Sequence, residues 1–228
     1  MFPLKDTEPS YSRPVVTTTL IVVNILIFLF EFSLPESSRY YLSRNALTSV
    51  YGLTPDHFRI ANLFTSMFLH GSWMHVLGNM LYLWVFGKRL EDALGHAKFL
   101  LFYLLCGCAA GISQVIASPY STLPMVGASG AIAGVMGAYL LKFPRARIVT
   151  LVFIFFFVTT FEIPAIVLLG YWFVIQVFSG LGSIARTHLS EGGVAWFAHV
   201  GGFLTGMLLL KLLGTRERYY HRRDYYWR

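Results

Sequence analysis

The sequence predicts an all-α polytopic membrane protein, and its composition and apolar runs carry this prediction. Of its 228 residues, 56% are hydrophobic and only 13% are charged. A soluble domain has about twice that charged fraction. Apolar runs suited to membrane helices recur along the chain, at residues 14–32, 72–87, 99–117, 129–142, 163–181 and 194–213.

Two apolar runs are too short for an ordinary span. Residues 129–142 would cover only about 21 Å of a bilayer core of about 30 Å, which predicts a short, buried fourth helix. Residues 148–161 are rich in Phe and β-branched residues and are followed by Glu162 and Pro164. We interpret this second run as re-entrant or as lying along the membrane interface.

The basic residues predict the orientation of six spans. With the N-terminus inside, all but four of the 18 Lys and Arg residues lie on the cytoplasmic side, the exceptions being Arg39, Arg44, Arg59 and Arg186. This bias predicts that both ends are cytoplasmic. The organisation is then a cytoplasmic N-terminal segment (1–13), a membrane domain (14–213) and a basic, aromatic cytoplasmic tail (214–228).

The tail interleaves arginines with tyrosines and a tryptophan. Such a pattern can bind RNA, but directly after a span it is more typical of an interfacial anchor. We therefore expect the lipid bilayer, and no nucleic acid, as the partner of this segment.

Four polar side chains fall at a similar depth in three of the predicted spans. Each of these spans runs inward from the outer face. His75 lies about 6 Å below the surface with Asn79 one turn deeper, Ser129 about 9 Å and His199 about 7–8 Å. Polar groups at membrane depth are costly and usually functional, so this shared depth predicts a site in an outer cavity.

Small residues would let two of these helices approach closely. Gly130, Gly134 and Gly137 form one stripe, and Ala198, Gly202 and Gly206 form another. Small residues at four-residue spacing allow helix backbones to come together. Packing the two stripes would bring the His199 imidazole to the Ser129 hydroxyl.

Ser129 and His199 are candidates for a nucleophile and its general base. The imidazole would take the hydroxyl proton during attack and return it to the leaving amine. No acidic residue lies near them in the outer half of a span, which predicts a dyad. The simpler alternatives are a helix N-cap for Ser129 and a hydrogen-bonded interior histidine for His199.

Three further polar groups surround this pair in the prediction. His75, Asn79 and the backbone N–H of Ser129 could donate hydrogen bonds to the oxyanion that forms on attack. Asn79 could instead tie helices together, and His70 could order a loop. A zinc site from His70, His75 and His199 is disfavoured because no HExxH pair and no interior carboxylate base accompany them.

Three motifs together resemble those of the rhomboid intramembrane serine proteases. They are His75-xxx-Asn79, Gly127-Ala128-Ser129-Gly130 and Ala198-His199-xx-Gly202-Phe203-xx-Gly206. The likeness extends through Leu69-His70-Gly71-Ser72-Trp73 and Glu91-xxx-Gly95, and it covers about residues 14–213. Each motif alone is common, but their order and placement on the predicted spans are specific to this family.

The resemblance implies a six-transmembrane-helix rhomboid-like bundle that cleaves membrane-protein substrates near the outer ends of their transmembrane helices. It implies Ser129 as nucleophile, His199 as base, His75 and Asn79 as oxyanion donors, and Gly127 and Gly130 in the nucleophile loop. It implies no cofactor and no metal, and a gate formed by the fifth span and residues 182–193. The light tail and lack of a transit peptide suggest a prokaryotic plasma membrane protein.

Two departures from the family pattern stand out. Many members carry a Trp-Arg pair in the first outer loop, and none occurs around Ala61-Asn62 in the connection 33–62. Some members have an aromatic residue four positions after the serine, where this chain has Ala133. Another group must therefore orient His199.

Two other functions fit a multi-span protein with these motifs. An inactive relative that only binds transmembrane clients would not need the intact set of Ser129, His199, His75 and Asn79. A transporter would need polar residues across the whole membrane, whereas the inner halves of these spans are nearly all apolar. The sequence therefore favours a serine endopeptidase.

Overall fold

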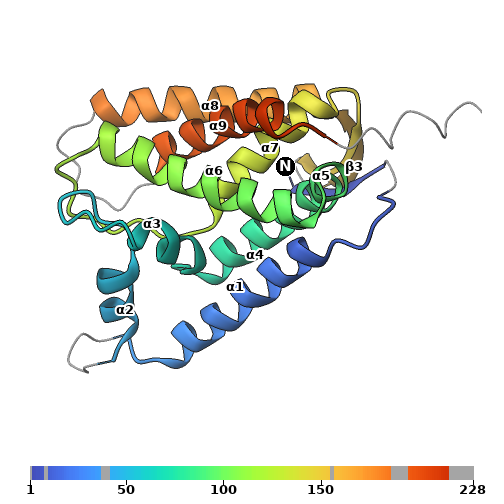
Figure 1. Ribbon diagram of the computed structural model, residues 1–228. Helices are drawn as coiled ribbons and strands as arrows, with labels where there is room; N and C mark the ends of the chain where they lie inside the picture. The colour runs from blue at the N-terminus through green and yellow to red at the C-terminus, as the bar shows by residue number, and fades with distance from the viewer. Residues whose placement is uncertain (1, 8–9, 37–41, 155–156, 186–194, 216–228) are drawn as a thin grey trace, which may run out of the picture.

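A computed structural model of the protein shows a helical bundle with a small sheet at one end (Figure 1). It describes residues 2–7, 10–36, 42–154, 157–185 and 195–215. Four helices in this part of the chain are long and apolar enough to cross a membrane. They are α1 (Val15–Ser33), α6 (His96–Ala117), α8 (Ala165–Ala185) and α9 (Trp196–Leu213). They match the predicted runs 14–32, 99–117, 163–181 and 194–213.

The other two predicted runs are helical as well. The run 72–87 begins a continuous helical segment made of α4 (Trp73–Tyr82), the π-helical η2 (Leu83–Gly87) and α5 (Lys88–Leu94). The run 129–142 is α7 (Ser129–Lys142). Residues Gly130 to Tyr139 of α7 are all buried, and α4, α6, α8 and α9 all contact this helix. The prediction of a short helix buried in the bundle is confirmed.

The predicted packing of small residues occurs between α7 and α9. A Cβ atom added to Gly202 would lie 2.1 Å from the carbonyl oxygen of Gly130, and one added to Gly206 would lie 2.0 Å from that of Gly134. A Cβ on Gly137 would meet the Phe203 carbonyl oxygen at 2.1 Å. The two backbones are therefore in direct contact, which only glycine permits at these positions.

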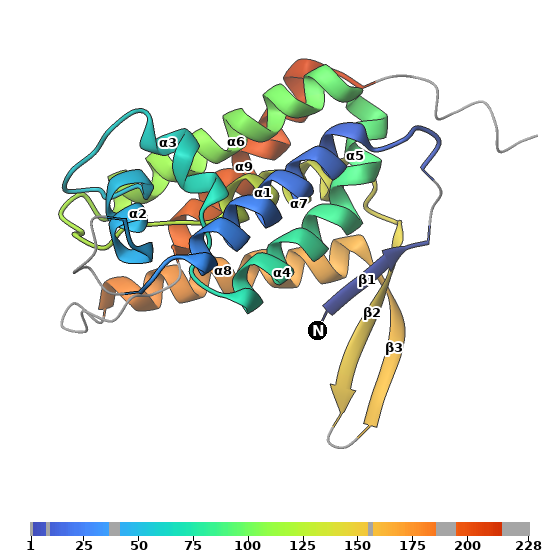
Figure 2. The same ribbon diagram turned by 90° about the horizontal axis from the view of Figure 1, so that it is seen from below.

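The prediction that the chain is all-α is wrong in one region, because the run 148–161 forms strands. β2 (Arg147–Ile154) and β3 (Phe157–Pro164) are antiparallel, and β1 (Phe2–Asp6) completes the sheet in the order β1-β2-β3. The many β-branched and aromatic residues of this run favour strands. Figure 2 shows the sheet at the end of the bundle opposite α2 (Arg44–Tyr51), with its hairpin extending past the helices.

A buried ion pair fixes the sheet to the bundle. Asp6 at the end of β1 accepts from Arg89 of α5 at 2.9 Å, and the Tyr139 hydroxyl of α7 also donates to this carboxylate. Asp6 and Arg89 are 2% and 6% exposed. Because a buried carboxylate must be paired, this contact determines where the N-terminal segment docks.

Glu91 positions the start of α1. Its carboxylate accepts from the backbone N–H groups of Val16 and Thr17, both at 2.8 Å. The first N–H groups of a helix lack partners within the helix, and a negative charge there is stabilising. Gly95, which has a φ of 82°, then turns the chain from α5 into α6. The two residues of the Glu91-xxx-Gly95 motif thus hold together α1, α5 and α6.

The other connections hold short helices. The predicted connection 33–62 contains α2 and leads into α3 (Asn62–Thr65) and the 3-10 helix η1 (Ser66–Phe68). Asn62 donates to the carbonyl oxygens of Val50 and Gly52 at 3.1 and 2.7 Å. This contact closes the segment on itself, and α3 lies beside α6, as Figure 1 shows.

The close approach of α7 and α9 yields a stability prediction. Gly202→Ala would place a methyl group against the backbone of Gly130, so we expect a loss of about 1–3 kcal/mol in the free energy of unfolding. Gly170→Ala on α8 is the matched control, since a Cβ there meets nothing within 4 Å. Thermal unfolding in detergent measures both variants, and equal midpoints would contradict the packing described.

Candidate active site

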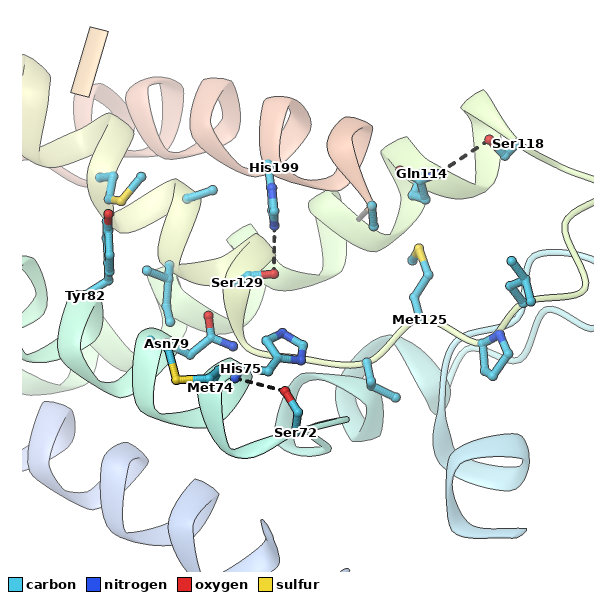
Figure 3. Close-up of a pocket in the computed structure, with 18 of the residues that line it drawn as sticks. Ser72, Met74, His75, Asn79, Tyr82, Gln114, Ser118, Met125, Ser129 and His199 are labelled. Carbon is cyan, nitrogen blue, oxygen red and sulfur yellow. Dashed lines mark hydrogen bonds between the residues drawn. The ribbon is translucent and has the colours of Figure 1, made fainter. Parts of the chain in front are cut away.

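Ser129 and His199 meet at the interface between α7 and α9. The Ser129 Oγ lies 2.8 Å from the His199 Nε2, although the residues are 70 positions apart in sequence. Ser129 is the first residue of α7, and His199 lies in the first turn of α9 (Figure 3). The sequence-based expectation that these two groups meet agrees with this geometry.

The Ser129 hydroxyl does not act as a helix cap. The N-cap of α7 is Ala128, and no side chain caps this helix end. Ser129 is partly buried, and its hydroxyl is paired with the His199 imidazole. The structure therefore does not support the simple N-cap alternative, because the Ser129 hydroxyl bonds to His199 and not to the start of its own helix.

The loop before Ser129 is held by the connection between α1 and α4. Leu53 and Met125 exchange two backbone hydrogen bonds, at 2.9 and 2.8 Å, and the Gly127 N–H donates to the Ser66 carbonyl oxygen at 2.8 Å. Gly127 has a φ of 120°, which side chains rarely adopt. Gly130 lies in the helix, not in the loop, and a Cβ there would meet the Ala110 Cβ of α6 at 2.6 Å. Gly127 thus shapes the loop, and Gly130 allows α6 to pack.

His75 and Asn79 reach the same place from α4. A Cβ on Gly127 would lie 2.6 Å from the His75 Nε2 and 3.5 Å from the Asn79 Nδ2, so both side chains border the loop. Figure 3 shows them projecting from α4 toward Ser129. The Asn79 Nδ2 is buried and has no hydrogen-bond partner among the described residues. A buried donor without a partner beside a nucleophile is suited to bind a developing negative charge.

The N-terminal turn of α4 is fixed by Ser72. Its hydroxyl oxygen accepts from the His75 backbone N–H at 3.2 Å. His70 is only 2% exposed, and its ring lies 5.1 Å from that of His75 in an edge-to-face arrangement. The His70 ring therefore packs against the His75 ring from the segment that precedes α4. Within the described residues, no three or more His, Cys, Asp or Glu side chains gather as metal ligands.

Sequence reasoning missed Gln176. Its Oε1 lies 2.7 Å from the His199 Nδ1, and the side chain is 5% exposed. It comes from α8, one turn after Trp172, whose ring lies 5.6 Å from the imidazole. A polar residue in the middle of the apolar run 163–181 was the available signal, because such residues are rare and usually functional.

The start of α9 is anchored to α6. The Ala198 N–H donates to the Gln114 Oε1 at 3.2 Å. This bond satisfies one of the free N–H groups at the helix N-terminus and fixes the turn that carries His199.

A cavity of about 810 Å³ opens in front of the serine–histidine pair. Its wall combines side chains of α4, α7, α8 and α9 with the loop before α7, and includes Tyr82, Val126, Ile132, Met136 and Trp172. A mostly apolar cavity with a few convergent polar groups is typical of a binding site for an organic ligand or peptide segment. The expected gate loop 182–193 and the expected interfacial anchor in the tail lie almost wholly outside the described residues.

The chain belongs to the rhomboid family. Residues 57–216 match the model of the Rhomboid domain, which is more than half of the chain. Together with the apolar helices, this membership defines a multi-pass membrane protein.

Several curated proteins are similar over parts of their length. The chain is 36% identical over 125 residues to YdcA of Bacillus subtilis (strain 168), which covers 55% of this chain and 61% of YdcA. It is 28% identical over 193 residues to Rhomboid protein 1, mitochondrial, of Saccharomyces cerevisiae, covering 83% of this chain and 50% of that protein. Over 78 residues it is 42% identical to Rhomboid protease GluP of Bacillus subtilis, covering 34% and 15%. The chain thus spans about three fifths or less of each of these relatives.

Proposed function

We propose that this protein is an intramembrane serine endopeptidase that hydrolyses peptide bonds in or near the transmembrane helices of membrane proteins. The observation that carries the proposal is the 2.8 Å contact between the Ser129 Oγ and the His199 Nε2 at the edge of a cavity. Family membership and the protease relatives support the class of reaction.

The reaction proceeds through an acyl-enzyme. The Ser129 Oγ attacks the carbonyl carbon of the substrate peptide bond while the His199 Nε2 takes the hydroxyl proton. The C–N bond breaks as the imidazolium gives this proton to the leaving amine, and the acyl group remains as an ester on Ser129. His199 then takes a proton from water, the resulting hydroxide attacks the ester, and the proton returns to the Ser129 oxygen as the acid is released.

The negative charge that forms on the substrate oxygen needs donors. We assign this role to the Asn79 amide, the His75 ring and the Ser129 backbone N–H. The unpartnered, buried Asn79 Nδ2 supports the assignment, because a ground-state partner would compete with the oxyanion. Removing one such donor typically costs about 2.7–4 kcal/mol of transition-state stabilisation.

A six-span topology places this site toward the outer face. In this proposal the four long helices are four of the six spans. The α4–α5 segment and α7 are the other two. Both termini are then cytoplasmic, which accords with the distribution of the basic residues. We propose the plasma membrane of a prokaryote as the location, in line with the similar Bacillus subtilis proteins. Each substrate is then a membrane protein that reaches the cavity from within the bilayer.

Replacing the nucleophile tests the proposal. Ser129→Ala should abolish cleavage of a single-span reporter protein in liposomes, because the proposed reaction takes its attacking oxygen from this hydroxyl. Ser49→Ala is the matched control: its hydroxyl lies on α2 and donates only to the nearby Ala46 carbonyl oxygen. Cleavage that persists in Ser129→Ala and survives repurification would rule out Ser129 as the nucleophile.

The oxyanion assignment predicts a kinetic effect. Asn79→Ala should lower kcat by about 10²-fold with the protein still folded. Asn24→Ala is a matched control, since Asn24 is also a buried asparagine of a long helix, and its amide donates to the Leu20 carbonyl oxygen at 2.7 Å. We expect Asn24→Ala to lower the melting temperature and to leave kcat near the wild-type value. Equal kcat values for the two variants would make Asn79 a structural residue.

A further inference from the structure

Both ring nitrogens of His199 have polar partners from different helices. The Nε2 lies 2.8 Å from the Ser129 Oγ of α7, and the Nδ1 lies 2.7 Å from the Gln176 Oε1 of α8. His199 is 9% exposed and Gln176 is 5% exposed. The two contacts form a continuous line from the amide of α8 through the imidazole of α9 to the hydroxyl of α7.

The tautomer of His199 decides whether it can act as a base. A neutral imidazole carries one ring proton, and the other nitrogen has a lone pair. The Nε2 can take the Ser129 proton only if the ring proton is on the Nδ1. The Gln176 amide has its oxygen, not its NH2 group, turned toward the Nδ1 at 2.7 Å, so it accepts a hydrogen bond from a proton there. With the amide in this orientation, the opposite tautomer would set two lone pairs against each other.

Gln176 provides the acceptor for a proton on the His199 Nδ1. Among the residues that the structure describes, the titratable side chain that acts electrostatically on this ring is His75 of α4. Trp172 and Trp196 contact the imidazole through their rings, with centroids at 5.6 and 6.5 Å. These aromatic contacts restrict the ring sterically, but they provide no acceptor for the Nδ1 proton. Ala133 of α7 contributes only a methyl group.

The position of Gln176 on α8 is itself unusual. Most other side chains on this helix are apolar, and many are exposed, among them Ile166, Val167, Val174, Ile175 and Phe178. A buried amide in such surroundings is costly unless its polar atoms are bonded. The free energy gained by its bond to His199 therefore holds the amide, the imidazole and α8 in one arrangement.

We propose that Gln176 is a positioning residue that holds His199 in the Nδ1-protonated tautomer and orients its Nε2 toward Ser129. This inference rests on the proposed function for its kinetic consequence, while the tautomer itself is a property of the resting protein. The amide oxygen takes the place of the carboxylate that orients the histidine in a serine–histidine–aspartate triad. It accepts the hydrogen bond without adding a charge.

Nitrogen NMR of the protein with ¹⁵N-labelled histidine tests the tautomer directly. The His199 signals are assigned by their loss in His199→Ala. In the wild-type protein we expect a protonated Nδ1 and an unprotonated Nε2. A proton on the Nε2 in the wild type would overturn the proposal without any variant.

Kinetics test the positioning role. Gln176→Met keeps the length of the side chain and removes the acceptor, so kcat should fall by about 10- to 100-fold while KM changes little. The NMR signals of His199 should shift toward the Nε2-protonated form. Gln176→Glu keeps an acceptor oxygen and should recover most of kcat at neutral pH. Tyr171→Phe is the control, because it removes a polar group from an exposed position on the same helix.

The outcomes separate this inference from the proposed function. Wild-type kcat and an unchanged tautomer in Gln176→Met would refute the role of Gln176 and leave the endopeptidase standing. A wild-type protein that cleaves no membrane substrate would refute the endopeptidase, and the NMR spectra would still decide the role of Gln176.

Discussion

The direct contact of the α7 and α9 backbones is the constraint on which the site depends. Gly202 and Gly206 of α9 face the carbonyl oxygens of Gly130 and Gly134, with no room for a side chain between them. Ser129 comes directly before Gly130 on α7, and His199 lies one turn before Gly202 on α9. The contact between the two backbones therefore sets the distance between the Ser129 hydroxyl and the His199 imidazole. The other elements act through it: α6 supports both helices, α4 supplies the polar groups opposite Ser129, and α8 covers His199.

Much of this arrangement could be predicted from the sequence, because the physics involved is local or periodic. The apolar runs predicted the six helical segments. Small residues at four-residue spacing predicted the faces of α7 and α9 that pack together. The length of 129–142 correctly indicated a short, buried helix. The distance of each residue from the start of its helix also predicted that Ser129, His199, His75 and Asn79 lie together, and all four line one cavity. Their depth in a membrane stays a prediction.

Two features could not be predicted in this way, because they depend on contacts between distant segments. The run 148–161 pairs with β1 at the other end of the chain, and the anchor of that strand is the Asp6–Arg89 ion pair. The β-branched composition of this run favours a strand, but no local pattern identifies the strand that pairs with it. The contact of Gln176 with His199 depends on how α8 rotates against α9, which no periodicity reveals. The sign in the sequence is a polar residue inside an apolar span, and it is an amide where a triad would have a carboxylate.

The central claim is that the Ser129 hydroxyl meets the His199 imidazole. Reaction of the protein with a fluorophosphonate tests this claim most directly. The probe modifies a serine only when a base activates its hydroxyl, and it needs no membrane substrate. We expect intact-mass and peptide analysis to find one adduct, on Ser129, in the wild type. The control variant His57→Ala should give the same result, because the His57 side chain is 81% exposed. In His199→Ala the adduct should be absent. Undiminished labelling of Ser129 in His199→Ala would contradict the account.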